Sequence, residues 1–130
     1  SEMSRFLLVP LILLITAISP GAMSRGQVQN RRVIEITAER FEFWPSEVMV
    51  DHGEEVELRI RSLDTIHGFR IAGTGTNLVV PKRGKGHAVT TFTATTPGRY
   101  TIECNRMCGA GHNFMRAVLI VRESPTSGAR

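Results

Sequence analysis

The sequence predicts an all-β fold, a sandwich or a small barrel of about seven or eight short strands. Short runs of apolar and β-branched residues alternate with turn signals about every 8 to 12 residues, which is typical of such folds. No segment after residue 24 has the 3.6-residue period of an amphipathic helix, and no internal repeat is visible. Hydrophobic residues make up 42% of the 130 residues, which suffices for one core and one domain.

The first half of the chain contains the clearest strand pattern. Apolar residues at 56, 58 and 60 alternate with charged neighbours, which is the two-residue period of a strand with one buried face. Two further strands are predicted at Val33–Thr37 and Glu47–Asp51. Between them, Phe41–Pro45 is predicted to form an aromatic corner.

The second half continues in the same way, with strands separated by glycine and proline turns. The predicted strands are Ile66–Ala72, Leu78–Val80, His87–Thr95, Arg99–Glu103 and Ala117–Arg122. The last of these is almost continuously apolar, as expected for a strand at the centre of a sandwich. A basic loop over residues 82–86 and a Pro97-Gly98 turn separate the later strands.

The N-terminal residues 1–24 are predicted to be a signal peptide or a short membrane anchor. Phe6–Ile18 is an almost wholly apolar run behind Arg5, and Ala22 and Ser24 provide the small residues of a cleavage site. Its length is nearer to a signal sequence than to a full membrane span. Residues 25–32 are predicted to form a linker and 124–130 a flexible tail, around a domain at 33–123. The domain is therefore expected outside the cytoplasm.

The charge distribution argues against nucleic-acid binding. The formal net charge is +4, but between Val33 and Glu123 the sequence has eleven basic and eleven acidic residues. The excess positive charge lies in the N-terminal segment, the linker and the tail. A nucleic-acid interface requires basic residues on the folded face that meets the phosphates.

A cluster of metal-binding residue types follows the Arg99–Glu103 strand. Cys104, Cys108, His112 and Met115 follow one another at intervals of four, four and three residues. Thiolate, imidazole and thioether are ligands that suit copper. Two cysteines in an exported protein also suggest a disulfide, but a disulfide gives no reason for the His and Met at these spacings.

A closed metal site needs a further ligand, and His67 is the best candidate. It starts an apolar strand next to Gly68, which would let another chain segment approach closely, whereas His52 and His87 are predicted to be solvated. A single blue copper uses two His, one Cys and a weak Met, so this cluster has one Cys too many. Zinc could take two Cys and two His but would leave Met115 unused. Two copper ions sharing the thiolates would use every residue of the cluster.

These residues resemble the dinuclear copper (CuA) motif of cytochrome c oxidase subunit II. The ligand loop is similar to C-x-[E/Q]-x-C-G-x-x-H-x-x-M, and residues 65–69 and 96–100 are similar to two further segments of the family. The resemblance covers about residues 33–123 and is closest to the short subunit II of B-type haem–copper oxidases. It implies a cupredoxin-like Greek-key β-sandwich.

The resemblance also implies the ligand set and the partners. Cys104 and Cys108 would bridge two coppers, His67 and Met115 would complete one, and His112 with the backbone carbonyl of Arg106 would complete the other. Electrons would pass from a c-type cytochrome to the haem subunit of the oxidase, subunit I, at the periplasmic face of the membrane, and the isolated chain would catalyse no reaction. Because an arginine side chain cannot bind a cation, we expect no magnesium site at position 106.

Two questions remain open at the level of sequence. The aromatic residues Phe41, Phe43 and Trp44 are a candidate patch where electrons enter, although they could equally fill one end of the sandwich. The alternatives to an oxidase subunit are a soluble periplasmic CuA electron carrier and a copper-handling protein that does not relay electrons. A zinc- or disulfide-stabilised domain without a redox role is a further alternative.

Overall fold

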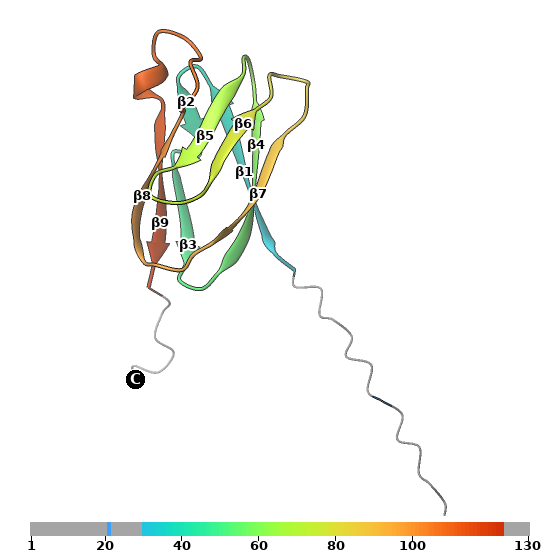
Figure 1. Ribbon diagram of the computed structural model, residues 1–130, viewed down its shortest axis with the longest axis vertical. Coiled ribbons are helices and arrows are strands. Elements are labelled where there is room, and N and C mark those ends of the chain that lie inside the picture. Colours follow the sequence, from blue (N-terminus) through green and yellow to red (C-terminus); the bar gives the residue numbers. More distant parts are fainter. Residues whose placement is uncertain (1–20, 22–29, 124–130) are drawn as a thin grey trace, which may run out of the picture.

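A computed structural model of the chain contains two β-sheets packed face to face, as the strand pattern predicted (Figure 1). The structure describes residue 21 and residues 30–123, and the predicted signal or anchor, most of the predicted linker and the predicted tail lie outside these residues. The described strands run from Arg32 to Arg122. Among the described residues, none belongs to a helix with the length and apolar character needed to cross a bilayer.

The smaller sheet has four strands in the order β2-β1-β4-β7. Its members are β1 (Arg32–Glu39), β2 (Glu42–Trp44), β4 (Glu55–Ser62) and β7 (Ala88–Thr93). β1 and β4 pair in parallel, while the other pairs are antiparallel. The aromatic corner predicted at Phe41–Pro45 is therefore a short edge strand that folds back on β1.

The larger sheet has five strands in the order β3-β9-β8-β5-β6. Its members are β3 (Glu47–Asp51), β5 (His67–Ile71), β6 (Asn77–Val80), β8 (Gly98–Glu103) and β9 (Arg116–Arg122). β9, the strand with the almost continuously apolar sequence, is an internal strand between β3 and β8. Its burial nevertheless alternates, because one of its faces meets the core and the other is only half-covered.

The core lies between the sheets and is formed by their inward-facing apolar residues. Leu58 and Ile60 of β4 are fully buried, and Phe43 meets Phe69 edge to face with ring centroids 5.7 Å apart. Each such side chain contributes about 1.5–3 kcal/mol by leaving water. The two sheets therefore form a rigid scaffold for the loops at their ends.

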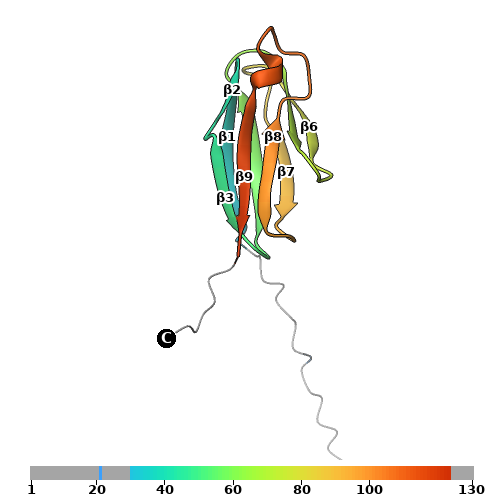
Figure 2. The ribbon, with the colours of Figure 1, turned by 90° about the vertical axis from the view of Figure 1, so that its left-hand side faces the viewer.

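The loops at one end of the sandwich include the segment with the metal-binding residue types. Figures 1 and 2 show the β8–β9 connection, in orange and red, at the end opposite the start of β1 and the end of β9. This connection contains one turn of 3₁₀-helix, His112–Phe114, which was not predicted from the sequence. The β1–β2, β4–β5 and β6–β7 connections lie at the same end.

Candidate metal centre

The ligand loop, residues 104–115, begins where the pairing between β5 and β8 stops. β5 pairs with β8 only through Ile71 and Arg70, opposite Ile102 and Glu103. Beyond Glu103 the two strands no longer pair. The loop residues Asn105 and Arg106 instead lie against Gly68 of β5. The Cys104 amide donates to the Met115 carbonyl at 3.2 Å, which closes the base of the loop. The first and last predicted ligands of the loop are thus neighbours.

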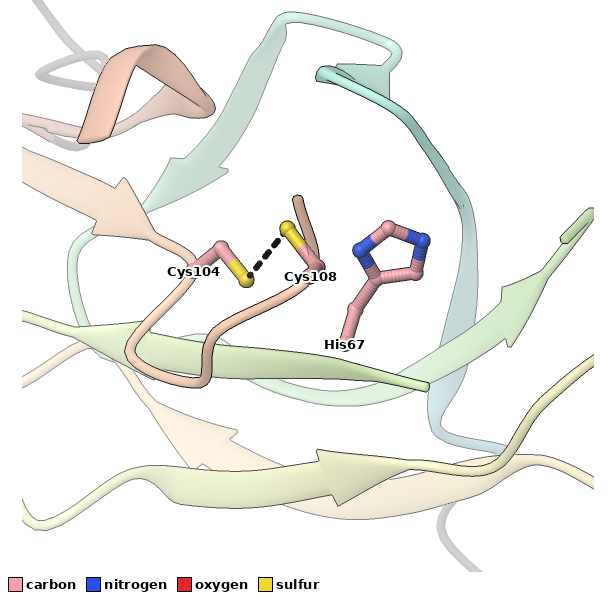
Figure 3. Close-up of side chains that lie close together, drawn as sticks. All are labelled: His67, Cys104 and Cys108. Atoms are coloured by element: carbon pink, nitrogen blue, oxygen red, sulfur yellow. Dashed lines mark hydrogen bonds between the residues drawn. The ribbon is translucent and has the colours of Figure 1, made fainter. Parts of the chain in front are cut away.

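The two cysteines are buried, and their sulfur atoms lie 3.6 Å apart without a disulfide bond (Figure 3). Burial and the neighbouring Cys104 thiol raise the pKa of Cys108 to about 11. Without a cation nearby, Cys108 is therefore a neutral thiol at physiological pH. A bound metal ion reverses this preference, since coordination deprotonates a thiol outright.

His67 is fully buried and presents one ring nitrogen to the two thiols (Figure 3). The ligand atoms of His67, Cys104 and Cys108 all lie within 4.8 Å of one another. The Nδ1 of His67 has no hydrogen-bond partner among the described residues, although it is buried. An orphaned buried nitrogen costs about 1–3 kcal/mol, and a metal ion between the three side chains would remove that cost.

Asp64 holds the imidazole in this orientation. Its Oδ1 lies 2.6 Å from His67 Nε2. Burial alone would raise the pKa of Asp64, but hydrogen bonds from the Arg40 amide, His67 and the Thr65 amide outweigh it, so the pKa is lowered. An ionised carboxylate only accepts hydrogen bonds, so Nε2 carries the proton and Nδ1 offers its lone pair to a metal. Asp64 was not predicted as a site residue, although an acidic residue three positions before a candidate ligand is a signal that the sequence contains.

The remaining predicted ligands surround the two sulfur atoms. The Met115 Sδ and the His112 Nδ1 lie 3.9 Å and 3.8 Å from the Cys108 Sγ, and the Arg106 carbonyl oxygen lies 3.1 Å from the Cys104 Sγ. Met115 is fully buried and His112 is half-buried. The structure thus brings all six predicted metal-binding residues together.

Gly68 allows the ligand loop to approach β5. A Cβ atom at this position would lie 2.1 Å from the Asn105 Oδ1 and 2.9 Å from the backbone nitrogens of Asn105 and Arg106. The Gly68 amide also donates to the Cys104 Sγ at 3.3 Å. The close approach expected from the sequence therefore involves the two residues that follow the first cysteine.

Arg40 and Phe41 hold the other side of the loop, and no sequence signal pointed to this role for Arg40. The Arg40 Nε donates to the Cys108 carbonyl at 2.8 Å, and its amide donates to the Asp64 carboxylate at 2.9 Å. The Phe41 ring lies so close to Gly109 and Gly111 that a Cβ atom at either glycine would meet it within 3 Å. The β1–β2 turn therefore contacts both the ligand loop and the carboxylate that orients His67.

The three aromatic residues proposed as the point where electrons enter do not form one surface patch. Phe43 is buried in the core, Phe41 packs against the ligand loop, and only Trp44 of the three is well exposed, at 70%. A role of Trp44 in receiving electrons stays a prediction. The two other histidines, His52 and His87, are not part of the metal cluster.

Comparisons with known proteins agree with this geometry. A family model described as a cupredoxin-like domain matches residues 7–121. A cytochrome c oxidase subunit 2 of Thermus thermophilus is 37% identical over 95 residues, which are 72% of this chain and 68% of that protein. The chain belongs to the cytochrome c oxidase subunit 2 family. A second subunit 2, from a named strain of the same species, is also 37% identical, and the match spans 55% of its length.

Solved structures share the fold of this subunit 2 domain. A haem–copper terminal oxidase dimer matches with a TM-score of 0.64 and 24% identity, over 83% of this chain and 76% of that one. The periplasmic domain of oxidase subunit II from Bradyrhizobium japonicum matches with a TM-score of 0.64 and 18% identity, over 72% and 85%. Membership of the subunit 2 family implies copper as the metal of the His67, Cys104 and Cys108 cluster and supports a role in electron transfer.

Proposed function

We propose that this chain transfers electrons through a dinuclear copper centre held by the ligand loop and His67. The observation that carries the proposal is the buried, unpartnered Nδ1 of His67 facing two free thiols whose sulfur atoms lie 3.6 Å apart. One copper would leave the second thiol without a role. Two thiolates shared between two ions use both cysteines and leave one nitrogen ligand for each ion.

The resemblance of the ligand loop to the CuA motif supports a division of the other ligands between two coppers. Cys104 and Cys108 would bridge, His67 and Met115 would complete one copper, and His112 and the Arg106 carbonyl would complete the other. The Arg106 oxygen lies beside the Cys104 sulfur, and the Met115 and His112 donor atoms lie beside the Cys108 sulfur. Because the ligand from Arg106 is a backbone oxygen, its arginine side chain does not interfere.

A copper pair bound here would supply a one-electron couple, and the residues of this chain would keep its surroundings fixed in both redox states. Asp64 fixes the His67 ring, Gly68 admits the loop and Arg40 ties the Cys108 carbonyl to the β1–β2 turn. Burial of Cys104, Cys108 and Met115 excludes water from the sulfur ligands. Little atomic motion then accompanies electron transfer, which keeps its barrier low.

We further propose a c-type cytochrome as the electron donor, the haem-containing subunit I as the acceptor, and the periplasmic face of the membrane as the location. The name of the Thermus thermophilus relatives and the periplasmic domain from Bradyrhizobium japonicum support this assignment. A soluble CuA carrier in the periplasm is the second candidate, because the CuA ligand geometry would serve either role. Co-purification with a haem-containing membrane protein distinguishes the two.

Copper loading of the purified chain tests the proposed centre. We expect two coppers per chain and an intense purple, mixed-valence spectrum, with an EPR signal from one electron shared by two coppers. Cys104→Ser should abolish this spectrum, whereas Thr101→Ser, a hydroxyl-retaining change on the exposed face of β8, should leave it unchanged. A single copper per chain with a blue-copper spectrum, or a colourless zinc protein, would overturn the dinuclear assignment.

A further inference from the structure

The two ends of the sandwich differ in how their basic residues are paired. Arg31, Arg32 and Arg122 are ion-paired with Glu55, Glu54 and Asp51 at the end where β1 starts. At the metal end, a group of basic side chains makes no ion pair with any described residue: Arg61, Lys82, Arg83 and Lys85. We call these four residues together with His87 the basic rim.

The basic rim is connected directly to the metal centre. Val80, the last residue of β6, pairs with His67, so the loop that carries the rim leaves the sheet beside a metal ligand. The Arg83 amide donates to the Asp64 carbonyl at 3.0 Å, and Asp64 orients His67. Figure 1 shows the β6–β7 loop at the same end of the sandwich as the ligand loop.

The rim surrounds an open pocket of about 400 Å³ between the end of β4 and the β6–β7 loop. It is lined by Arg61, Ser62, Leu63, Arg83, Gly84, Gly86 and His87. Arg61, Arg83 and His87 are exposed, and no acidic side chain of the described residues lines the pocket. A concave site with two guanidinium groups and no counter-charge is complementary to carboxylates.

The acidic residues at the metal end do not neutralise the rim. Glu39 and Glu42 lie at the β1–β2 end, on the opposite edge of a sheet ordered β2-β1-β4-β7. Asp64 is already bonded to Arg40 and His67. The metal end therefore has unneutralised positive charge next to His67, which would orient an approaching charged partner.

We propose that the basic rim is the docking site for an electron-transfer protein whose contact face is acidic. The proposal rests on the proposed electron-transfer function and adds the charge of the partner. A cytochrome with a ring of lysines would be repelled from this side of the metal end, whereas carboxylates on a partner would be attracted and would bring its redox centre close to His67.

Charge reversal at Arg83 tests the proposal, with Arg99→Glu as the matched control. Arg99 is an exposed arginine at the start of β8, at the far end, and it also makes no ion pair with a described residue. Both variants change the net charge equally. The copper-loaded proteins would be mixed with two reduced c-type cytochromes, one of net negative and one of net positive charge, over a range of ionic strength.

With the acidic cytochrome, we expect the rate for the unmodified protein to fall as salt is added. At low salt Arg83→Glu should slow this reaction about threefold to tenfold, while Arg99→Glu changes it less than about twofold. With the basic cytochrome, Arg83→Glu should accelerate the reaction. The proposal is overturned if the reaction with the basic cytochrome is the one that salt slows, or if both variants behave alike.

A measurement without copper separates this proposal from the proposed function. In NMR titrations of the copper-free protein with the acidic cytochrome, we expect the amide shifts of residues 82–87 to move, and Arg83→Glu to abolish the change. If copper loading fails but these shifts appear, the electron-transfer function is wrong and the docking surface stands. Binding of phosphatidylglycerol vesicles through Arg83, with no shift from the cytochrome, would overturn the proposal in favour of a membrane contact.

Discussion

The Arg40 Nε donates a hydrogen bond to the Cys108 carbonyl oxygen at 2.8 Å, joining the first strand connection to the ligand loop across 68 residues of sequence. The same residue donates its amide to Asp64, the carboxylate that orients His67. The β1–β2 turn thus links both halves of the metal centre, and its contribution is measurable without any metal.

Replacement of Arg40 by glutamine should loosen the ligand loop of the copper-free protein. A hydrogen bond from a charged donor contributes about 1.5–3 kcal/mol. The bond from Arg40 to the Cys108 carbonyl is only partly buried, so its contribution should lie at the lower end of this range. We expect the free energy of unfolding in urea to fall by about 1–2 kcal/mol and hydrogen exchange of the loop amides to accelerate. Arg99→Gln is the control, and equal destabilisation by both variants would contradict a specific role for Arg40.

A side chain at position 68 should separate the loop from β5. The Cβ atom of Gly68→Ala would overlap Asn105, so the loop must shift, at a cost of about 1–3 kcal/mol. We expect weaker copper binding and a lower melting temperature. Gly75→Ala is the control, because nothing lies within 4 Å of a Cβ atom there. A Gly68→Ala protein that binds copper with unchanged affinity would contradict the tight approach.

The two methionines of the ligand loop should respond differently to the same substitution. Met115 is fully buried beside the Cys108 sulfur, whereas Met107 is 77% exposed. Met115→Leu keeps the side-chain volume, so the fold should survive, but in the proposed copper pair the loss of this donor should destabilise the oxidised state. We expect its reduction potential to rise and its visible bands to shift, as measured by voltammetry and absorption spectroscopy. Met107→Leu should change neither property.

Trp44 should affect electron transfer without affecting stability. Because its side chain is 70% exposed, Trp44→Leu should change the free energy of unfolding by less than about 0.5 kcal/mol. If electrons enter through this ring, the rate of reduction by a cytochrome should fall while the copper spectrum is unchanged. Val89→Ala, another exposed apolar position, is the control. An unchanged rate in Trp44→Leu would remove Trp44 from the path.

The ion pair between Arg32 and Glu54 should make stability depend on pH. The hydrogen bond from Arg32 lowers the pKa of Glu54 below its usual 4.5, and burial opposes this only in part. A lowered folded-state pKa stabilises the fold above about pH 4.5, and the contribution is lost as pH falls through the folded value. Pairs as exposed as this one contribute about 0.2–1 kcal/mol.

The comparison of the unmodified protein with Glu54→Gln isolates this contribution. The difference in free energy of unfolding between the unmodified protein and Glu54→Gln should be largest near neutral pH and should shrink toward zero in acid. Glu35→Gln, at a carboxylate that makes no ion pair with a described residue, should show a difference that varies less with pH. A difference for Glu54→Gln that grows in acid would contradict the assigned direction.

Much of the fold was predictable because the signals are local. The alternation over β4, the apolar run of β9 and the turn at Pro97-Gly98 each identify an element within a few residues. The parallel pairing of β1 with β4 and of β3 with β9 was not predictable, since it depends on the packing of both sheets. The edge strand β2 was missed because it is only three residues long and lies among aromatic side chains.

That the proposed ligands lie close together was predictable for the same reason, whereas the residues that support them were not. Cys104 to Met115 form one short motif, and His67 was the one histidine in an apolar strand beside a glycine. Arg40 and Asp64 carry no motif, because arginine and aspartate in polar turns are common. Their roles arise only when the β1–β2 and β4–β5 turns meet beside the ligand loop. This contact exists only in the folded chain.

The pairing of β3 with β9 joins residues 71 positions apart, so the sheet that carries the centre is completed late in folding. Such distant pairing is a slow event in folding, on the order of milliseconds to seconds. Met115 meets Cys104 through the local antiparallel pairing of β8 with β9, but the two cysteines are not covered until the two sheets have packed together. The two sulfurs therefore remain accessible to oxidants throughout that interval, and in an oxidising compartment the yield of copper-competent protein depends on folding being faster than sulfur–sulfur bond formation.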